Sequence, residues 1–399
     1  MMLSKIAIRI KQTTEYIFAV LTLLLCLLLT ACQTTAPKEF NPYPLLHDEL
    51  FPLYSKIQIE DKDDVFHIGQ SATSFVDKLL LRAQDSDHRI ETLANAINKH
   101  TEFNLLYKND ANTIASETFD NKAANCLSLT IMTFAMADYA NIGVKFQQVD
   151  IPELWVRRDG YSLLNLHVNL RLYQKNELDV ILYHSKSYQL DFDRRAQSLR
   201  LPVKTISKNR VLAMFYNNKG ADALIKDDYN TAYAYFRSAL VTDHFLVEAW
   251  TNLGLLYRHS GQIEYAENVY LQALQINGGD LTTLENLAYV YHITSRKAES
   301  KKIKALVLRQ RAENPFYHYM LGNVEYDNKN WLKAIEHYKK SIRLNKLHDE
   351  FYFSIAKSYY QLGDFKNSKK YVKLAKRHTY DDSQQAYYQS KLDNLSNLN

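Results

Sequence analysis

Glycine and proline are scarce in this chain, with 10 glycines and 7 prolines among 399 residues. Because turns draw heavily on both residues, their scarcity argues against a loop-rich all-β protein. The sequence also lacks a metal-ligand cluster, a phosphate-binding glycine loop and a dinucleotide fingerprint, so we expect no cofactor. Hydrophobic residues make up 46% of the chain and charged residues 23%, which indicates a globular protein, and the length favours two or three folded units.

A strong excess of charge of one sign is missing as well. The whole chain carries a net charge of +5. The first 31 residues contribute three basic residues and Glu15, a net charge of +2, so residues 32–399 keep +3. So small an excess over so long a chain does not indicate a partner made of nucleic acid.

Residues 1–31 have the pattern of a secretion signal. A basic head precedes the apolar run IFAVLTLLLCLLLTA, which ends in small residues. The end of this run, LTAC, resembles the lipobox of bacterial lipoproteins, where cleavage precedes the cysteine and lipid is attached to it, here Cys32. This resemblance implies an exported chain held to a membrane by acyl groups. Gln33 after Cys32 resembles an outer-membrane address, so we expect an outer-membrane lipoprotein that faces the periplasm; an uncleaved transmembrane anchor is the alternative.

Cysteine is almost absent from the rest of the chain. Of three cysteines, Cys26 lies in the signal and Cys32 is expected to carry lipid, which leaves Cys126. Exported proteins usually pair their thiols or avoid them. Cys126 is therefore either buried and inert or retained for its reactivity.

Residues 32–60 read as a tether, because they hold three prolines in QTTAPKEFNPYP and show no helical period. In residues 61–205, apolar residues recur at helical spacing in SATSFVDKLLLRAQ and HRIETLANAINKH, and NCLSLTIMTFAMADYA is apolar nearly all round, as in a buried helix. The segments VKFQQVDI, LHVNLRLY, ELDVILYH and SYQLDFD then predict strands, with a hairpin turn at QKNE. Helices followed by strands predict an α+β fold, an antiparallel sheet packed on a central helix.

Residues 206–395 contain an internal repeat. Small residues recur every 34 positions, and this period with paired helices is the signature of the tetratricopeptide repeat. The second repeat carries Trp250, Gly254 and Tyr257 in its first helix and Tyr270 in its second, and the third repeat fits least well. We expect about five repeats that form an all-α solenoid and bind a protein or peptide. The recurring small residues are Gly220, Gly254, Ala288, Gly322 and Ala356.

Cys126 stands at the start of the predicted buried helix. Asn125 before it suits the N-cap position. A thiol in the first turn of a helix is close to the positive end of the helix dipole, which favours the thiolate. The position suits a nucleophile, although small apolar cysteines are also common as filling in core helices.

A base and an orienting acid are available on the predicted strands. In NLHVNLRL, His167 alternates with the apolar residues and is expected to face away from the core, toward a cleft or toward solvent. Asp191 ends the strand of SYQLDFD and could bond the far nitrogen of His167, which would fix the tautomer and support the imidazolium. Asp193 is the alternative acid. Cysteine, histidine and aspartate in this order would supply a nucleophile, a proton donor and an orienter.

The segment ETFDNKAANCLSLTIMTFAMADYANIGVKFQQV, followed by NLHVNL and YQLDFD, resembles the transglutaminase-like superfamily over about residues 100–200. The resemblance implies a papain-like core in which Cys126 is the catalytic nucleophile, His167 the base and Asp191 the orienter. Trp155 and Gln148 are weaker candidates for residues that line the substrate site, Trp155 as a shield for the thiolate and Gln148 as an oxyanion donor.

Two classes of function follow from these patterns. The first is an exported, membrane-tethered thiol hydrolase or acyl transferase that attacks an amide, with hydrolysis favoured, and that docks its protein substrate on the repeats. The second is a non-catalytic envelope scaffold that binds partner proteins through the repeats. Superfamily resemblance does not decide between them, because function depends on the site rather than on the fold.

Overall fold

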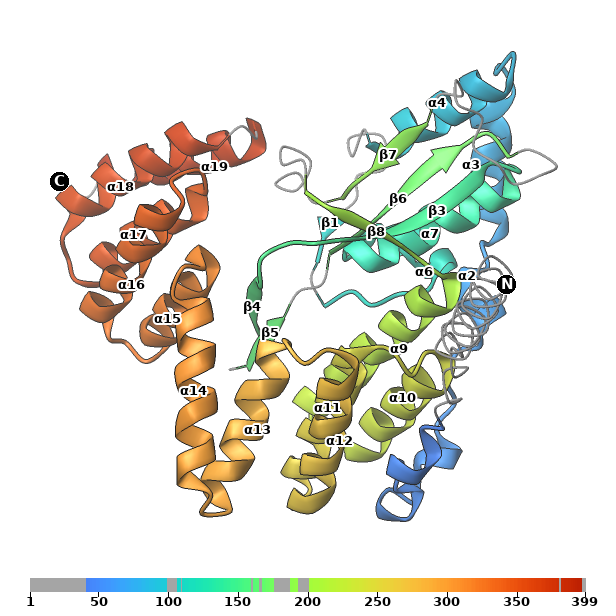
Figure 1. Ribbon diagram of the computed structural model, residues 1–399. Helices are drawn as coiled ribbons and strands as arrows, with labels where there is room; N and C mark the ends of the chain where they lie inside the picture. The colour runs from blue at the N-terminus through green and yellow to red at the C-terminus, as the bar shows by residue number, and fades with distance from the viewer. Residues whose placement is uncertain are drawn as a thin grey trace, which may run out of the picture. The chain divides into compact units, whose positions relative to one another are not determined.

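The front part of the chain is a small antiparallel sheet surrounded by short helices (Figure 1). The computed structural model describes residues 41–98, 106–108, 110–158, 161–164, 167–175, 187–192, 201–379 and 382–396. The helices are α2 (Lys62–Phe66), α3 (Gln70–Leu80), α4 (Ser86–Asn98), α6 (Ala115–Asn121) and α7 (Cys126–Tyr139). The first two α helices expected from the sequence are therefore α3 and α4, and the expected buried helix is α7.

The main sheet has the order β7–β6–β3–β8, and all its neighbours are antiparallel. Two small pairs complete the strands, the parallel pair β1–β2 and the antiparallel hairpin β4–β5. The expected strand over residues 177–184 lies outside the described residues. The strands are β1 (Leu106–Tyr107), β2 (Ala123–Ala124), β3 (Gly143–Val149), β4 (Trp155–Arg158), β5 (Tyr161–Leu164), β6 (His167–Tyr173), β7 (Tyr188–Leu190) and β8 (Val203–Ile206).

Helix α7 is the core of this part of the molecule. Eleven of its 14 residues are buried, and it packs against β3 and β6 of the sheet and against α9 of the repeats. A helix that is apolar all round must be covered on every side, which is the burial that its sequence predicts.

The polar face of strand β6 does not meet solvent, which was one of the two environments expected for it. His167 and Asn169 are as deeply buried as Val168 and Leu170 on the other face, and His167 borders a cavity, in agreement with the other expectation, a cleft. Helices α4 and α7 both pack against β6, so the polar residues of this strand are enclosed rather than solvated.

The segment before α2 also differs from its prediction as a tether. Phe51 is only 3% exposed and stacks on Tyr233 and Tyr257, with ring centroids 4.6 and 6.2 Å away. Asp48 accepts hydrogen bonds from Tyr233 and Arg237. These contacts hold two short 3-10 turns, Asp48–Leu50 and Tyr54–Lys56, on the first repeats. A segment without any regular period can therefore still be anchored by single aromatic and charged side chains.

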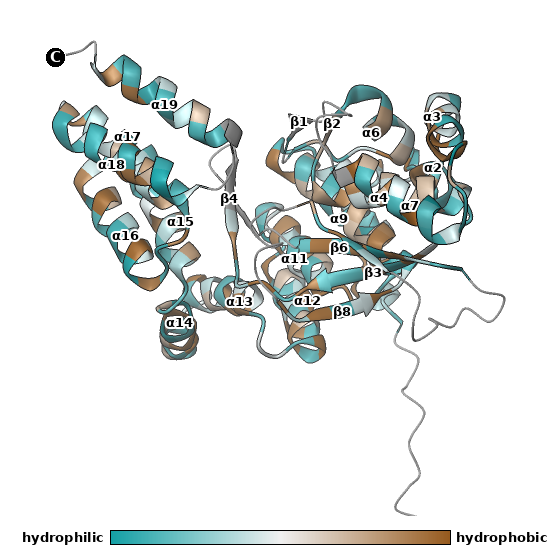
Figure 2. Cartoon of the chain, turned by 90° about the horizontal axis from the view of Figure 1, so that it is seen from above, coloured by the Kyte–Doolittle hydropathy of each residue, from teal (hydrophilic) through white to brown (hydrophobic). Residues whose placement is uncertain are grey.

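The repeat region consists of five helix pairs and a final helix in the described residues. Helix α19 closes the array by packing Tyr388 and Leu392 on Tyr352 and Val372, as the terminal unit of a repeat array must. Figure 2 shows hydrophobic and hydrophilic residues interleaved along these helices. They are α9 (Lys208–Ile225), α10 (Tyr229–Thr242), α11 (Val247–His259), α12 (Ile263–Ile276), α13 (Leu281–Ile293), α14 (Lys297–Arg311), α15 (Pro315–Asp327), α16 (Trp331–Leu344), α17 (Asp349–Gln361), α18 (Phe365–His378) and α19 (Asp382–Ser396).

The small residues of the 34-residue period let the helices of each pair approach closely. A Cβ atom added to Gly220 would lie 2.6 Å from the ring of Phe236, and Gly254 meets the ring of Tyr270 in the same way. No side chain fits at that separation, so the small residue and the aromatic residue must occur together. Residues Leu45–Asn399 form one compact unit, because the sheet region packs on the repeats. Among the described residues, none of the helices is both long and apolar enough to cross a membrane.

Candidate functional site

Cys126 begins helix α7, as its sequence predicts. The Asn125 side chain accepts a hydrogen bond from the backbone N–H of Ser128 at 2.9 Å and caps the helix. The Ser128 hydroxyl in turn donates to the carbonyl of Ala111 and receives the N–H of Thr113. This network fixes the first turn, so the Cys126 thiol is held at the positive end of a buried helix.

His167 and Asp191 come together on neighbouring strands. The pairing of β6 with β7 sets Leu170 opposite Leu190, and Asp191 follows directly. The Nε2 atom of His167 lies 2.7 Å from Oδ1 of Asp191, and the Asn169 side chain donates to the other carboxylate oxygen at 3.0 Å. Two of the three predicted catalytic residues therefore form a buried, oriented pair. Asp193, the alternative acid, lies outside the described residues.

The electrostatics of His167 connect it to Cys126. Burial by itself lowers the pKa of the imidazole, but the hydrogen bond and charge of Asp191 and a side-chain interaction with Cys126 outweigh it and raise the pKa to about 10. The Nδ1 atom is buried, and no described group meets it with ordinary hydrogen-bond geometry. The interaction that raises the pKa of His167 makes Cys126 a neighbour of this imidazole. The raised pKa favours an imidazolium at His167 near neutral pH.

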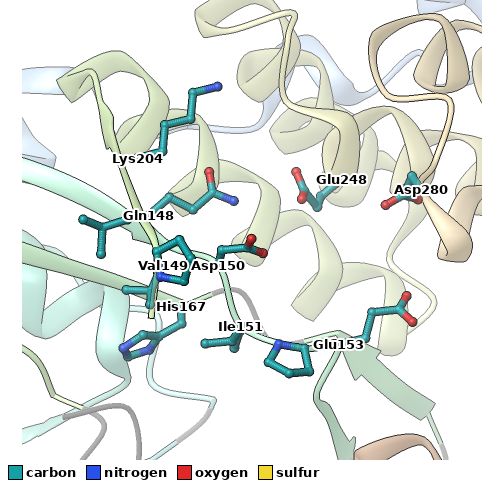
Figure 3. Close-up of a pocket in the computed structure, with 12 residues that line it drawn as sticks. Gln148, Val149, Asp150, Ile151, Glu153, His167, Lys204, Glu248 and Asp280 are labelled. Carbon is teal, nitrogen blue, oxygen red and sulfur yellow. The ribbon is translucent and has the colours of Figure 1, made fainter. Parts of the chain in front are cut away.

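A cavity of about 490 Å³ extends from His167 toward the repeats. Its walls come from the end of β3, the segment that follows it, the start of β8 and the first turns of α11 and α13. Figure 3 shows the carboxylates of Asp150, Glu248 and Asp280 directed into this space. Burial and the nearby carboxylate of Asp280 raise the pKa of Glu248. Gln148, predicted to line a substrate site, does line this cavity.

Trp155 occupies a different place from the one expected for it. Its ring is buried against the repeats, with the Arg311 guanidinium 5.0 Å and the Tyr317 ring 5.9 Å from its centroid. From the sequence, Trp155 was a candidate shield for the thiolate, but these contacts do not give it that role. The tryptophan instead fastens the start of β4 to α14 and α15.

Sequence reasoning missed three residues that shape this region. Asn169 holds Asp191, and its alternation with His167 along β6 was a signal that could have identified it. The buried Arg311 forms an ion pair with the partly exposed Glu153 across 158 positions of sequence, and nothing local to either residue indicates it. Cys32 lies outside the described residues. No cluster of three or more potential metal ligands is found in the part of the chain that the structure describes.

Comparison with known proteins identifies the repeats. Residues 247–280 match the model of the tetratricopeptide repeat, and residues 307–363 match a second model described as a TPR repeat. An uncharacterised protein of Rickettsia prowazekii is 26% identical over 146 residues, which are 33% of this chain and 42% of that protein. The uncharacterised protein ycf37 of Pyropia yezoensis is 39% identical over 77 residues, which are 18% of this chain and 43% of that protein. The chain thus spans less than half the length of these curated relatives.

Several solved structures resemble part of the chain. The MamA protein shows 22% identity and a TM-score of 0.24 over 44% of this chain and 94% of its own. Pseudomonas aeruginosa pilF shows 18% identity and a TM-score of 0.27 over 48% of this chain and 87% of its own. YrrB, described as a TPR protein with an unusual peptide-binding site, shows 12% identity and a TM-score of 0.25 over 45% of this chain and 92% of its own.

Proposed function

We propose that this protein binds a partner protein through its tetratricopeptide repeats and cleaves or transfers an acyl group with Cys126, His167 and Asp191. The repeats support the binding half, since stacked repeats create extended surfaces for proteins and peptides. The thiol chemistry rests on one observation, the buried His167–Asp191 contact of 2.7 Å beside the Cys126 that begins α7. Attachment through lipid on Cys32, at the periplasmic side of an outer membrane, belongs to the same proposal.

The geometry supports a sequence of proton and acyl transfers. The thiolate of Cys126 attacks the carbonyl carbon of an amide, and the C–N bond breaks as the amine leaves with a proton from His167. A thioester remains on Cys126. Water then attacks this thioester while His167 takes its proton, the C–S bond breaks, and an acid is released; an amine in place of water gives transfer. Asp191 holds the ring throughout and supports its positive charge.

A non-catalytic scaffold is the second candidate, and the burial of the site favours it. Cys126 is 5% exposed and His167 is 1% exposed, so a substrate reaches the thiol only after some part of the surrounding structure moves. A scaffold needs no such opening. In that case the three residues are a buried polar cluster, and binding through the repeats is the whole function.

Thiol reactivity distinguishes the two candidates. In a chain that begins at residue 33, Cys126 is the sole cysteine, so alkylation by iodoacetamide reports on it alone. We expect alkylation that persists at pH 6 and is lost in His167→Ala, because the imidazolium stabilises the thiolate. His244→Ala, at a histidine of the repeats, is the matched control and should alkylate like the parent. Slow alkylation that is identical in all three chains rules out the catalytic proposal and leaves the scaffold.

A further inference from the structure

Arg311, at the end of α14, is a buried charged side chain with 1% exposure. Its Nε and one terminal nitrogen bind both carboxylate oxygens of Glu153, at 2.7 and 2.8 Å. Its other terminal nitrogen donates to Glu285 of α13 at 2.7 Å. The two acidic partners raise the pKa of Arg311. A buried guanidinium with such fork-like pairing is a site that selects a carboxylate by geometry as well as by charge.

The residues after Glu153 are recognised as well. Trp155 lies under the same guanidinium and against the ring of Tyr317 on α15. Asn314 donates from its side-chain nitrogen to the backbone carbonyl of Glu153 at 2.9 Å, while its oxygen caps α15. Asn314 thus binds the backbone carbonyl of Glu153, Arg311 binds its carboxylate, and Tyr317 packs against the ring of Trp155. These are the contacts expected where a repeat array binds a short peptide.

The segment Glu153–Trp155 lies where the third helix pair, α13 and α14, meets the fourth, which begins with α15. Its partners come from α13, from the end of α14 and from the start of α15, and Figure 1 shows β4 and β5 beside these helices. Stacked repeats offer their continuous binding surface across such neighbouring units. The chain therefore places its own segment on a part of the repeat surface that is suited to a partner.

The same segment connects to the thiol site. It joins β3 to the β4–β5 hairpin, and β6 begins at His167 three residues after β5 ends. Glu153 and His167 border the same cavity (Figure 3). Movement of Glu153 away from Arg311 would alter the wall of the cavity that His167 also lines.

We propose that Arg311, Asn314 and Tyr317 form a recognition site for an acidic residue followed two positions later by tryptophan, and that Glu153–Trp155 is its internal occupant. A partner protein with the same pattern replaces this segment and thereby moves Glu153 out of the wall of the cavity that His167 also borders. The inference rests on the proposed binding role of the repeats and names the chemistry of the partner. Because a tethered occupant competes at an effective concentration on the order of millimolar, the exchange requires a partner that is local or extended.

Binding in trans tests the recognition site. The double variant Glu153→Gln/Trp155→Ala, in a chain that begins at residue 33 and keeps the compact unit Leu45–Asn399, removes the two anchoring side chains. A fluorescent peptide with the sequence of residues 151–157 is titrated against it by anisotropy. The control peptide carries glutamine for Glu153 and alanine for Trp155. We expect saturable binding of the first peptide and at least about tenfold weaker binding of the control, because buried charge pairs and aromatic anchors dominate such interfaces.

Arg311→Met in the double variant should abolish the preference for the first peptide over a peptide in which only Glu153 is replaced by glutamine, because the tryptophan can still meet Tyr317. If the double variant does not fold by circular dichroism, Trp155→Ala alone keeps the ion pair and is titrated with the same peptides. Equal affinity for the first peptide and the control peptide, or a preference over the glutamine-only peptide that survives Arg311→Met, overturns the inference.

Alkylation of Cys126 separates this inference from the thiol proposal. In the parent chain, millimolar peptide should raise the alkylation rate several-fold, and the control peptide should not. Equal binding of the two peptides together with His167-dependent alkylation overturns the recognition site and leaves the thiol chemistry standing. Preferential binding together with slow, His167-independent alkylation supports the recognition site and rules out the thiol chemistry.

Discussion

Replacing Asp191 with asparagine removes the negative charge beside His167 while nearly keeping the shape of the side chain. The carboxylate lies 2.7 Å from Nε2 of His167, and both groups are buried. Removing one charged partner from a buried pair usually costs about 3–5 kcal/mol, and we expect about 3 kcal/mol at pH 6.5, since the imidazole can release its proton when the carboxylate is gone. Chemical denaturation in urea measures this loss.

The pH dependence of that loss follows from the pKa of His167. In the folded protein this pKa is raised from 6.5 to about 10, so the proton on His167 stabilises the fold fully below pH 6.5. The stabilisation is lost as the pH rises through about 10. The difference in unfolding free energy between the parent and Asp191→Asn should therefore shrink steadily from pH 6.5 to pH 10. The tyrosines and lysines that titrate in the same range are common to both proteins, so their contributions to the unfolding free energy cancel in this difference.

The same variant should slow the alkylation of Cys126. Without the carboxylate, the imidazolium of His167 loses the hydrogen bond and the charge that favour it, so less of the stabilisation that it gives to the thiolate remains. The neutral control is Asp393→Asn, at an exposed carboxylate of α19. Parallel stability curves, or an unchanged alkylation rate in Asp191→Asn, would refute the assignment of Asp191 as the partner of His167.

Three further substitutions test the packing that supports the site. Gly254→Ala forces a methyl group against an aromatic ring of the paired helix and should cost about 1–3 kcal/mol in thermal melts, whereas Gly278→Ala, with ordinary contact distances, should cost little; equal midpoints contradict the close-approach argument. Phe51→Ala should lower the free energy of unfolding in urea by about 3–5 kcal/mol if the segment before α2 is part of the fold. Leu53→Ala, at a half-exposed residue, is the control and should change it little. An unchanged free energy of unfolding in Phe51→Ala would support the interpretation of this segment as a tether. Asn125→Ala removes the cap of α7 and should cost about 1 kcal/mol and slow alkylation of Cys126; an unchanged alkylation rate would show that the cap does not position the thiol.

The repeats were predictable because their signal is local and recurs. Gly220 must face the aromatic ring of Phe236, and 34 residues later Gly254 faces the ring of Tyr270 in the same way. Helix α7 was predictable for a related reason, since a run that is apolar all round has one stable environment. The contact between His167 and Asp191 was predicted from the position of Asp191 at the end of a neighbouring strand and from the superfamily resemblance, with Asp193 as the alternative acid.

The enclosure of the site was not predictable in the same way. Alternation along β6 shows which residues share a face, but whether that face meets solvent depends on helices that are distant in sequence. Phe51 gave no periodic signal, because a single ring can anchor an irregular segment. Arg311 and Glu153 look like ordinary surface charges in their local sequence, and only the folded chain places them together.

The third repeat departs from the pattern of the others, and the structure suggests why it can do so. Lys304 occupies the position of the aromatic residue that faces the small residue in other repeats, and its side chain is exposed. In place of that contact, the buried hydroxyl of Ser300 on α14 donates to the carbonyl of Ala288 on α13 at 2.7 Å, and Arg311 joins the same two helices through Glu285. Polar contacts therefore replace aromatic packing in this repeat, and one of them is shared with the segment at Glu153. Release of that segment should loosen α13 and α14 before any other pair. Faster hydrogen exchange in these two helices than in α11 and α12 of the double variant Glu153→Gln/Trp155→Ala would be its signature.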